Sequence, residues 1–175
     1  MSESGDASAR PRLLFLTDSL GEKTPGANAL LWLAASLDAS GIDCAVISFL
    51  PCEKHRREQI RASGIPVRFL QFFNSRIKFY APGLTASVLL FRPDCVVLAA
   101  GAAHLHAGPL ARAFRGIRLA SFLPEEKTRG SLLVRLARKR CAATFDFPFP
   151  KNSASESEKR AFVENFVTKI FGKNA

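Results

Sequence analysis

The sequence lacks the motifs that mark several common classes of protein. It has no CxxC pair and no Cys/His cluster, and its four cysteines lie far apart, at Cys44, Cys52, Cys95 and Cys141. A zinc site needs closely spaced ligands, so we expect no metal site. Isolated cysteines in apolar, strand-like surroundings are typical of buried, reduced thiols, which fits a reducing cytoplasm.

Long apolar runs are also missing. No window reaches the roughly 18 apolar residues that a membrane-spanning helix needs. Met1 to Ala9 lack the basic and then apolar organisation of a signal peptide, and we expect residues 1–11 to be a disordered leader. The sequence therefore predicts a soluble, cytoplasmic protein that at most contacts a membrane surface.

Acidic residues are few, because 25 Lys and Arg outnumber 15 Asp and Glu and give a formal charge of +10 at pH 7. This charge points to an anionic partner: nucleic acid, a phosphorylated small molecule or an acidic membrane surface. A basic amphipathic helix over residues 129–140 is one candidate contact. It can lie at a membrane interface, touch a phosphate backbone, or pack on the core with a solvated basic face. Its basic side chains are Arg129, Arg135, Arg138, Lys139 and Arg140.

Apolar runs alternate with helical segments along residues 12–146, and the length of 175 residues suits one domain. Continuous apolar runs predict strands covered on both faces, and intervening helices predict parallel pairs. We therefore expect an α/β fold of three layers, with a mostly parallel Rossmann-like sheet of about six strands and helices on both faces. The expected strands are residues 13–16, 44–49, 65–70, 95–100, 117–122 and 141–145, and the expected helices are 27–37, 51–61, 84–91, 107–114 and 132–140.

A proline-containing linker over residues 147–154 precedes a last helix over residues 155–172. Ser155 and Glu158 have the spacing of a capping box at its start. Phe162, Phe166 and Ile170 form an apolar stripe along it. We expect this helix to dock on the domain.

Ligands of open parallel sheets bind beyond the carboxyl ends of the strands, where loop amides and helix N-termini converge. The first such end has neither the GxGxxG nor the GxxxxGKS/T spacing, which disfavours a dinucleotide or P-loop site. Two interpretations remain open for it: a cradle for a phosphate or a sugar hydroxyl, and a tight turn without a ligand. The candidate contacts are Asp18, Gly21, Gly26, Ala27 and Asn28.

A second strand end holds Gly101 and two histidines, His104 and His106. Histidine titrates near neutral pH and can act as a general base or bind a hydroxyl group. The same pair is also consistent with a surface loop. A third end carries Glu125 and Glu126, which suit acid–base chemistry or the acidic first turn of a helix.

Several short motifs follow one another in an order that resembles the N-terminal, acceptor-binding half of GT-B glycosyltransferases of the retaining, family-4 type. They are Pro25-Gly26-Ala27-Asn28 after the first strand, Leu33-Ala34-Ala35-Ser36-Leu37 closed by Gly41, Gly64-Ile65-Pro66-Val67, and Arg92-Pro93-Asp94-Cys95-Val96-Val97 leading to Gly101 and His104. The likeness spans residues 12–146.

The resemblance implies a role in glycan or polysaccharide biosynthesis, with a glycan or lipid-linked sugar as acceptor and His104 orienting its hydroxyl. The donor-binding half, with its E-x7-E pair, has no counterpart, and Ser121 to Pro124 replace a histidine that the family often carries. We therefore expect a split-enzyme subunit or a degenerate, non-catalytic relative at the inner face of the membrane. It would bind no cofactor alone, and a nucleotide sugar only with a donor-domain partner.

The rival interpretation is a non-enzymatic basic domain that binds nucleic acid or acts in regulation. Residues 69–80 interleave aromatic and basic side chains in the way that favours single-stranded nucleic acid.

Overall fold

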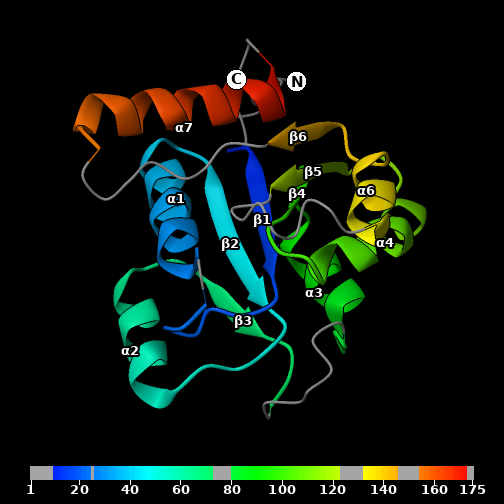
Figure 1. The fold of residues 1–175 in the computed structure, drawn as a ribbon, viewed down its shortest axis with the longest axis horizontal. Coiled ribbons are helices and arrows are strands. Elements are labelled where there is room, and N and C mark those ends of the chain that lie inside the picture. The colour runs from blue at the N-terminus through cyan, green and yellow to red at the C-terminus, as the bar shows by residue number, and fades with distance from the viewer. Residues whose placement is uncertain (1–9, 25, 73–79, 123–131, 146–153, 173–175) are drawn as a thin grey trace, which may run out of the picture.

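A computed structural model describes residues 10–24, 26–72, 80–122, 132–145 and 154–172. The strands are β1 (Arg12–Thr17), β2 (Asp43–Ser48), β3 (Val67–Phe69), β4 (Cys95–Leu98), β5 (Arg118–Phe122) and β6 (Ala143–Phe145). The helices are α1 (Ala27–Ala39), α2 (Lys54–Ala62), α3 (Leu84–Phe91), α4 (Ala107–Ala113), α6 (Leu132–Arg138) and α7 (Glu156–Phe171), with the 3₁₀ helix η1 (Ala103–His106) before α4 (Figure 1).

The six strands form one sheet in the order β3-β2-β1-β4-β5-β6, and every neighbouring pair is parallel. Leu14 of β1 lies opposite Ala45 of β2 on one side and Val96 of β4 on the other. The predicted α/β fold with a parallel, Rossmann-like sheet is therefore confirmed. The strand order reverses between β1 and β4, and this switch point is where such sheets bind ligands.

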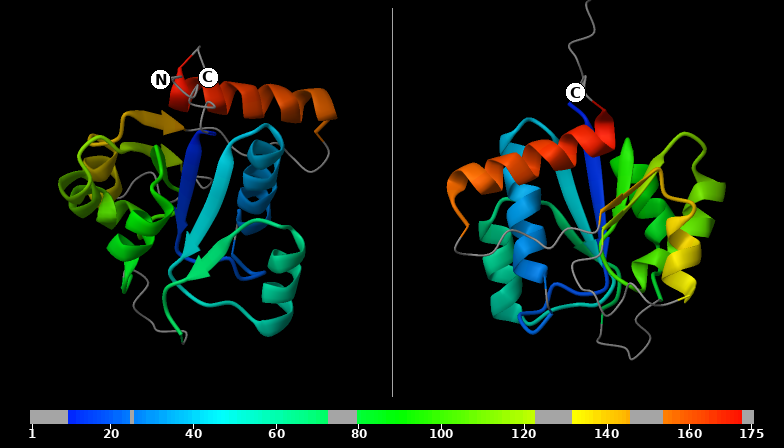
Figure 2. Two further views of the ribbon diagram at one scale, coloured as in Figure 1. Left: turned by 180° about the vertical axis from the view of Figure 1, so that it is seen from behind. Right: turned by 45° about the horizontal axis from the view of Figure 1, so that its top comes forward.

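Alternate residues of β1 point to opposite faces of the sheet and enter two separate cores. Leu13 and Phe15 join the core under α1, α2 and α7, whereas Leu14 and Leu16 join the core under α3, α4 and α6. Figures 1 and 2 show the resulting three layers. Burial of both faces explains why the strands have continuous apolar runs instead of alternating ones.

Helix α7 packs on the first core although it is remote from it in sequence (Figure 2). The predicted capping box is confirmed, since Ser155 Oγ accepts from the amide of Glu158 and the Glu158 carboxylate accepts from the amide of Ser155. The Phe166 ring lies 6.2 Å from that of Phe15 and 6.0 Å from that of Phe122, centroid to centroid. Aromatic contacts thus join α7 to β1 and β5.

Some expectations fall outside the described ranges. These are residues 1–9 of the expected leader, residues 73–79 of the basic and aromatic segment, the two glutamates Glu125 and Glu126, Arg129, and residues 147–153 of the linker.

Candidate functional site

The carboxyl ends of β1 and β4 meet at the switch point of the sheet, and Asp18 joins them. Its carboxylate accepts hydrogen bonds from the backbone amides of Ala102 and Ala103, at 3.3 and 3.2 Å. These amides open η1, where an anion is electrostatically favoured. Because Asp18 occupies this position, an incoming phosphate would have to displace a carboxylate that belongs to the protein. Gly101 lies beside this contact and is half-buried.

The loop after β1 is a tight turn that leads into α1. The amide of Gly21 donates to Ser19 Oγ at 3.1 Å, and the carbonyl of Gly21 accepts from the amide of Thr24 at 2.9 Å. Gly26 has φ of 79°, a left-handed conformation that favours glycine. Helix α1 then begins without a side-chain cap and without an acidic residue in its first turn. Ala27 is buried and Asn28 is exposed at this helix start.

Arg56 of α2 holds this loop in place, a role that the sequence did not indicate. Its side chain is buried, and its Nε donates to the carbonyl of Leu20 at 3.0 Å. Its guanidinium also donates to Oδ1 of Asn28 and, at 3.0 Å, to Oε1 of Gln59. Arg56 therefore fixes both sides of the turn between β1 and α1.

One sequence signal was available for Arg56. It lies one helical turn before Ile60, which is also buried, so the two share the core-facing side of α2. The sequence of this segment indicates only a strongly charged helix, and the burial of Arg56 departs from that pattern.

His104 is buried, with 1% of its surface exposed. Its Nδ1 lies 2.6 Å from the carbonyl oxygen of Ala100, and its Nε2 lies 2.7 Å from Oγ of Ser121. A carbonyl only accepts, so Nδ1 carries the proton and Nε2 accepts from the Ser121 hydroxyl. Burial lowers the pKa of His104, the Arg138 charge lowers it further, and the bond to Ala100 opposes this. The neutral imidazole thus ties the end of β4 to β5.

The interpretation of the two histidines as a surface-loop pair is wrong for His104, because η1 turns it into the core. His106 is half-buried and packs edge-on against Phe49, with the ring centroids 5.1 Å apart. Both nitrogens of His104 are engaged, so a role as base would require its ring to leave Ser121. The catalytic role stays a prediction.

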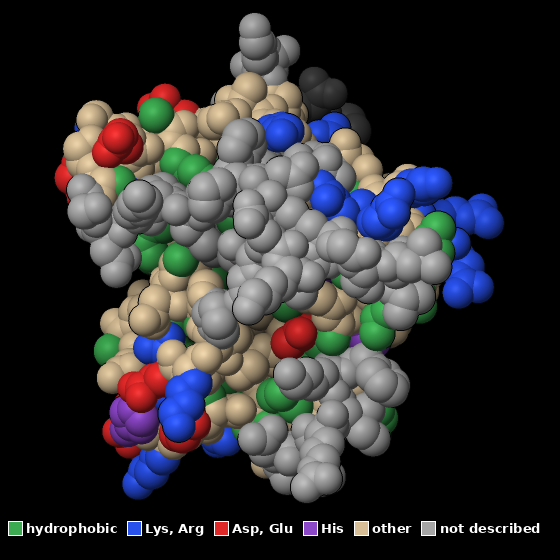
Figure 3. All heavy atoms as spheres, viewed as in Figure 1, with side chains coloured by type: hydrophobic (Ala, Val, Ile, Leu, Met, Phe, Trp, Pro, Cys, Tyr) green, Lys and Arg blue, Asp and Glu red, His purple; other side chains and the backbone are tan. Residues whose placement is uncertain are grey.

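A basic surface covers the β5 and β6 side of the molecule. Arg135, Lys139 and Arg140 are exposed and Arg138 is half-buried. The described residues 95–122 and 132–145 contain seven Lys and Arg and no Asp or Glu. Figure 3 shows Lys and Arg gathered on the edge of the molecule where α6 lies.

Helix α6 packs its apolar side on the protein through Val134 and Ala137, which are buried. Leu136 is half exposed, at 50%. The alternative of a core-packed helix with a solvated basic face is therefore confirmed for these residues. An acidic surface would meet mainly basic side chains here.

All four cysteines are free, as predicted, and Cys44, Cys52 and Cys95 are buried. Within the described ranges, no group of three or more His, Cys, Asp or Glu is placed to hold a metal ion. None of the helices in those ranges is both long and apolar enough to cross a membrane. A scan against protein-family models finds no match, and a search of curated proteins finds none.

Proposed function

We propose that this chain is a glycosyltransferase-like acceptor domain in glycan or polysaccharide biosynthesis. The observation that carries the proposal is the arrangement at the switch point between β1 and β4. There, a half-buried carboxylate, Asp18, and the uncapped start of α1 lie at the strand ends where such sheets bind ligands. Carboxylate and amide groups match sugar hydroxyls, which both donate and accept hydrogen bonds.

The same arrangement suits an acceptor better than a nucleotide. The amides that open η1 are held by Asp18, and the loop from Gly21 to Gly26 lacks the glycine spacing of a phosphate cradle. The nucleotide sugar would then enter with a donor-binding partner. Without such a partner the domain binds the acceptor and transfers nothing.

The basic surface around α6 supports a membrane location for this domain. Its charge suits the acidic inner face of a membrane, where lipid-linked sugar acceptors would be presented. Association would be electrostatic and peripheral, since Val134 and Ala137 are already buried in the protein.

Ligand-observed NMR on the full chain tests acceptor binding. Soluble mono- and disaccharides should receive saturation from the protein, whereas the nucleotides UDP and GDP should not. Asp18→Asn should weaken the saccharide effect because it removes the charge at the switch point. Asp38→Asn, which changes an exposed aspartate at the far end of α1, is the matched control. Equal saccharide binding by Asp18→Asn and by the unchanged chain would refute the proposal.

The basic surface also favours a second candidate, a non-enzymatic domain that binds nucleic acid. Its affinity for RNA or DNA would fall steeply with salt, and replacing Arg135 or Lys139 by Gln would reduce the log–log slope by about 1 for each phosphate that the side chain had neutralised. If the membrane is the partner instead, Arg135→Glu with Lys139→Glu should lower partition onto anionic vesicles about tenfold or more. Saccharide binding is expected of the acceptor domain and not of the nucleic-acid-binding domain, so it distinguishes the two candidates.

A further inference from the structure

The residues that the structure describes cover one half of one sheet face thinly. Helices α1, α2 and α7 cover the first face, and α4 and α6 lie on the second face beside β4 and β5. Over β2 and β3, α3 is the one helix that the described residues place on the second face, and it has only eight residues. Helix α3 packs through Leu84 and Val88 and leaves Leu89 and Leu90 exposed, at 58% and 74%.

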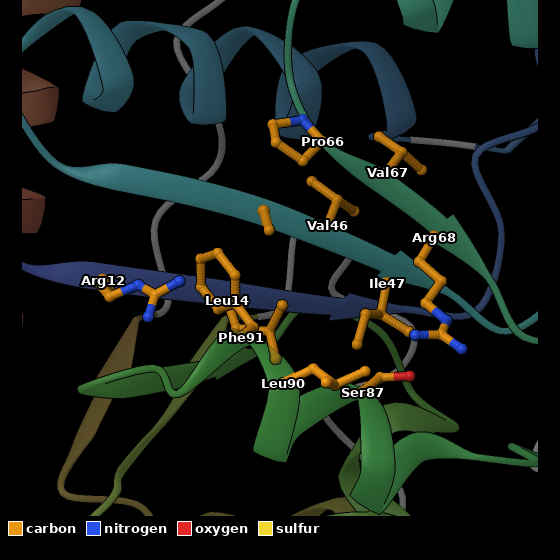
Figure 4. A pocket seen from close by; sticks show the side chains of 11 residues that line it. Arg12, Leu14, Val46, Ile47, Pro66, Val67, Arg68, Ser87, Leu90 and Phe91 are labelled. Atoms are coloured by element: carbon orange, nitrogen blue, oxygen red, sulfur yellow. The ribbon is translucent and has the colours of Figure 1, made fainter.

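A cavity of about 360 Å³ lies between α3 and this part of the sheet (Figure 4). This volume is in the lower part of the range of small-molecule sites. Its walls are mainly apolar and come from three strands and one helix. They include Leu14, Ala45, Ile47, Leu90 and Phe91.

Two arginines lie at opposite ends of the cavity, as Figure 4 shows for Arg12 and Arg68. In the register of the sheet, Arg12 lies opposite Asp43 and Arg68 lies opposite Ile47. The two positions are therefore four residues apart along β2, which is about 13 Å. The cavity is thus long, apolar in the middle and positively charged at both ends.

The side chain of Arg12 lacks an anionic partner in the described part of the chain. Its guanidinium stacks on Phe91, 4.5 Å from the ring centroid, and its Nε is buried without a hydrogen-bond acceptor. The two nearby carboxylates have other contacts: Asp94 accepts from the backbone amide of Arg12 at 2.8 Å, and Asp43 lies 3.9 Å from Arg10. A buried donor without an acceptor is costly, and a ligand oxygen would relieve that cost.

The side chain of Arg68 is exposed and makes no hydrogen bond or ion pair with any residue that the structure describes. Ser87 is the one uncharged polar residue among those that line the cavity, and its hydroxyl already donates to the carbonyl of Gly83 at 2.9 Å. The cavity therefore has few polar groups that could recognise a nucleobase or a sugar ring by hydrogen bonds. It offers apolar contact and positive charge.

We propose that this cavity binds an aliphatic chain with an anionic head, such as a medium-chain carboxylate. The head accepts from the guanidinium of Arg12, and the chain lies over Leu14 and Ile47. Arg68 adds positive charge at the other end and disfavours a cationic amphiphile. This site lies on the sheet face under α3, away from the switch point at Asp18, and it does not depend on the acceptor function proposed above.

Calorimetric titration of the full chain with sodium decanoate tests the site. We expect saturable binding of one decanoate per chain, and binding about tenfold weaker or worse for decanol, which lacks the charge. Each methylene removed from the carboxylate should weaken binding roughly fourfold. Arg12→Gln should weaken decanoate binding about tenfold, because it removes the charged donor.

Two neighbouring residues of α3 provide a matched pair. Leu90→Glu places a negative charge on the cavity wall and should abolish binding, whereas Leu89→Glu, on the same helix but outside the cavity, should not. Both side chains are exposed, so both variants should fold. Arg135→Gln on the basic surface should leave decanoate binding unchanged.

Several results would overturn the proposal: no saturable heat with decanoate, equal affinity for decanol, or equal losses in the two glutamate variants. Anionic phospholipid vesicles distinguish a free carboxylate from a membrane lipid as the source of the chain. If Leu90→Glu abolishes decanoate binding and leaves vesicle partition intact, the ligand is a free amphiphile. If Leu90→Glu also abolishes vesicle partition, the cavity takes the chain from a membrane lipid.

Discussion

The Nε2 atom of His104 lies 2.7 Å from the hydroxyl oxygen of Ser121, and this hydrogen bond joins the helical turn after β4 to strand β5. Both partners are buried. Because the other ring nitrogen donates to the carbonyl of Ala100, the imidazole is satisfied on both sides. The contact lies next to the switch point, so the shape of the candidate site depends on it.

Replacing His104 by Ala should lower the free energy of unfolding by about 2–3 kcal/mol, because two buried hydrogen bonds and the ring packing are removed. A double-mutant cycle with Ser121→Ala should give a coupling energy of about 1 kcal/mol. Urea denaturation measures both quantities. His55→Ala, which removes an exposed imidazole, is the control and should cost far less. Additive effects at His104 and Ser121 would contradict the contact.

The same histidine predicts a pH dependence of stability. Burial is the largest cause that lowers the pKa of His104 below its usual 6.5. Between the lowered pKa and 6.5 the unfolded chain binds more protons than the folded chain, so stability rises with pH there. The stability that neutral His104 contributes is complete above pH 6.5 and is lost as the pH falls through the lowered pKa.

Comparison with His104→Gln isolates this effect from the other titrating groups. We expect the stability difference between the two proteins to be constant above about pH 6.5 and to shrink below it. Urea denaturation at several pH values between about 5 and 8 gives the two curves. A difference that grows as the pH falls would mean that His104 is stabilised in its charged form.

Arg56 should be more important for stability than its place in a charged helix indicates. Arg56→Met keeps an unbranched apolar stem but leaves the buried carbonyl of Leu20 and the amide oxygen of Asn28 without their donor, at a cost of about 2 kcal/mol. Arg56→Lys should recover only part of this, since an ammonium cannot reach three acceptors in a planar fork. Thermal unfolding provides the measurement.

The control for Arg56 is Arg61→Met, on the same helix and exposed. It should change stability by no more than about 0.5 kcal/mol. Equal effects at the two positions would show that Arg56 acts only through its charge.

Most strands and helices could be predicted because they depend on local sequence. Helix α3 has the predicted bounds, Leu84–Phe91, and α4 ends one residue earlier than predicted, at Ala113. Strand β3 is shorter than predicted, with only Val67–Phe69 in the ladder, because it pairs on one side alone at the edge of the sheet.

The candidate site was less predictable, because its contacts join distant parts of the chain. Arg56 reaches a carbonyl 36 residues away, and His104 reaches a hydroxyl 17 residues away. Periodicity places a residue on a face of its own element but does not say which loop that face meets. The cavity under α3 likewise follows from a short helix on a wide sheet. The likeness to glycosyltransferases stays a prediction.

The packing of α7 predicts that Phe166 is essential to the stability of the chain. Phe166→Ala should lower the free energy of unfolding by about 3–5 kcal/mol, since it leaves a cavity between the rings of Phe15 and Phe122. Asn165→Ala, on the exposed side of the same helix, is the control. Denaturant unfolding measures both variants. Loss of the helix without loss of stability would show that α7 is only loosely attached.

The cysteines should react slowly in the folded chain. Burial raises the pKa of Cys44 and of Cys95 to about 12, and that of Cys141 to about 11. Only the thiolate attacks iodoacetamide, and a pKa near 12 leaves about one thiolate in ten thousand at pH 8. Mass spectrometry after a short exposure should find Cys44 and Cys95 unmodified, Cys141 modified first of these three because it is half-buried, and all four modified in urea. Rapid labelling of Cys95 under native conditions would mean that the strand pair β4 and β5 opens to solvent, since Cys95 lies opposite Arg118 in that pair.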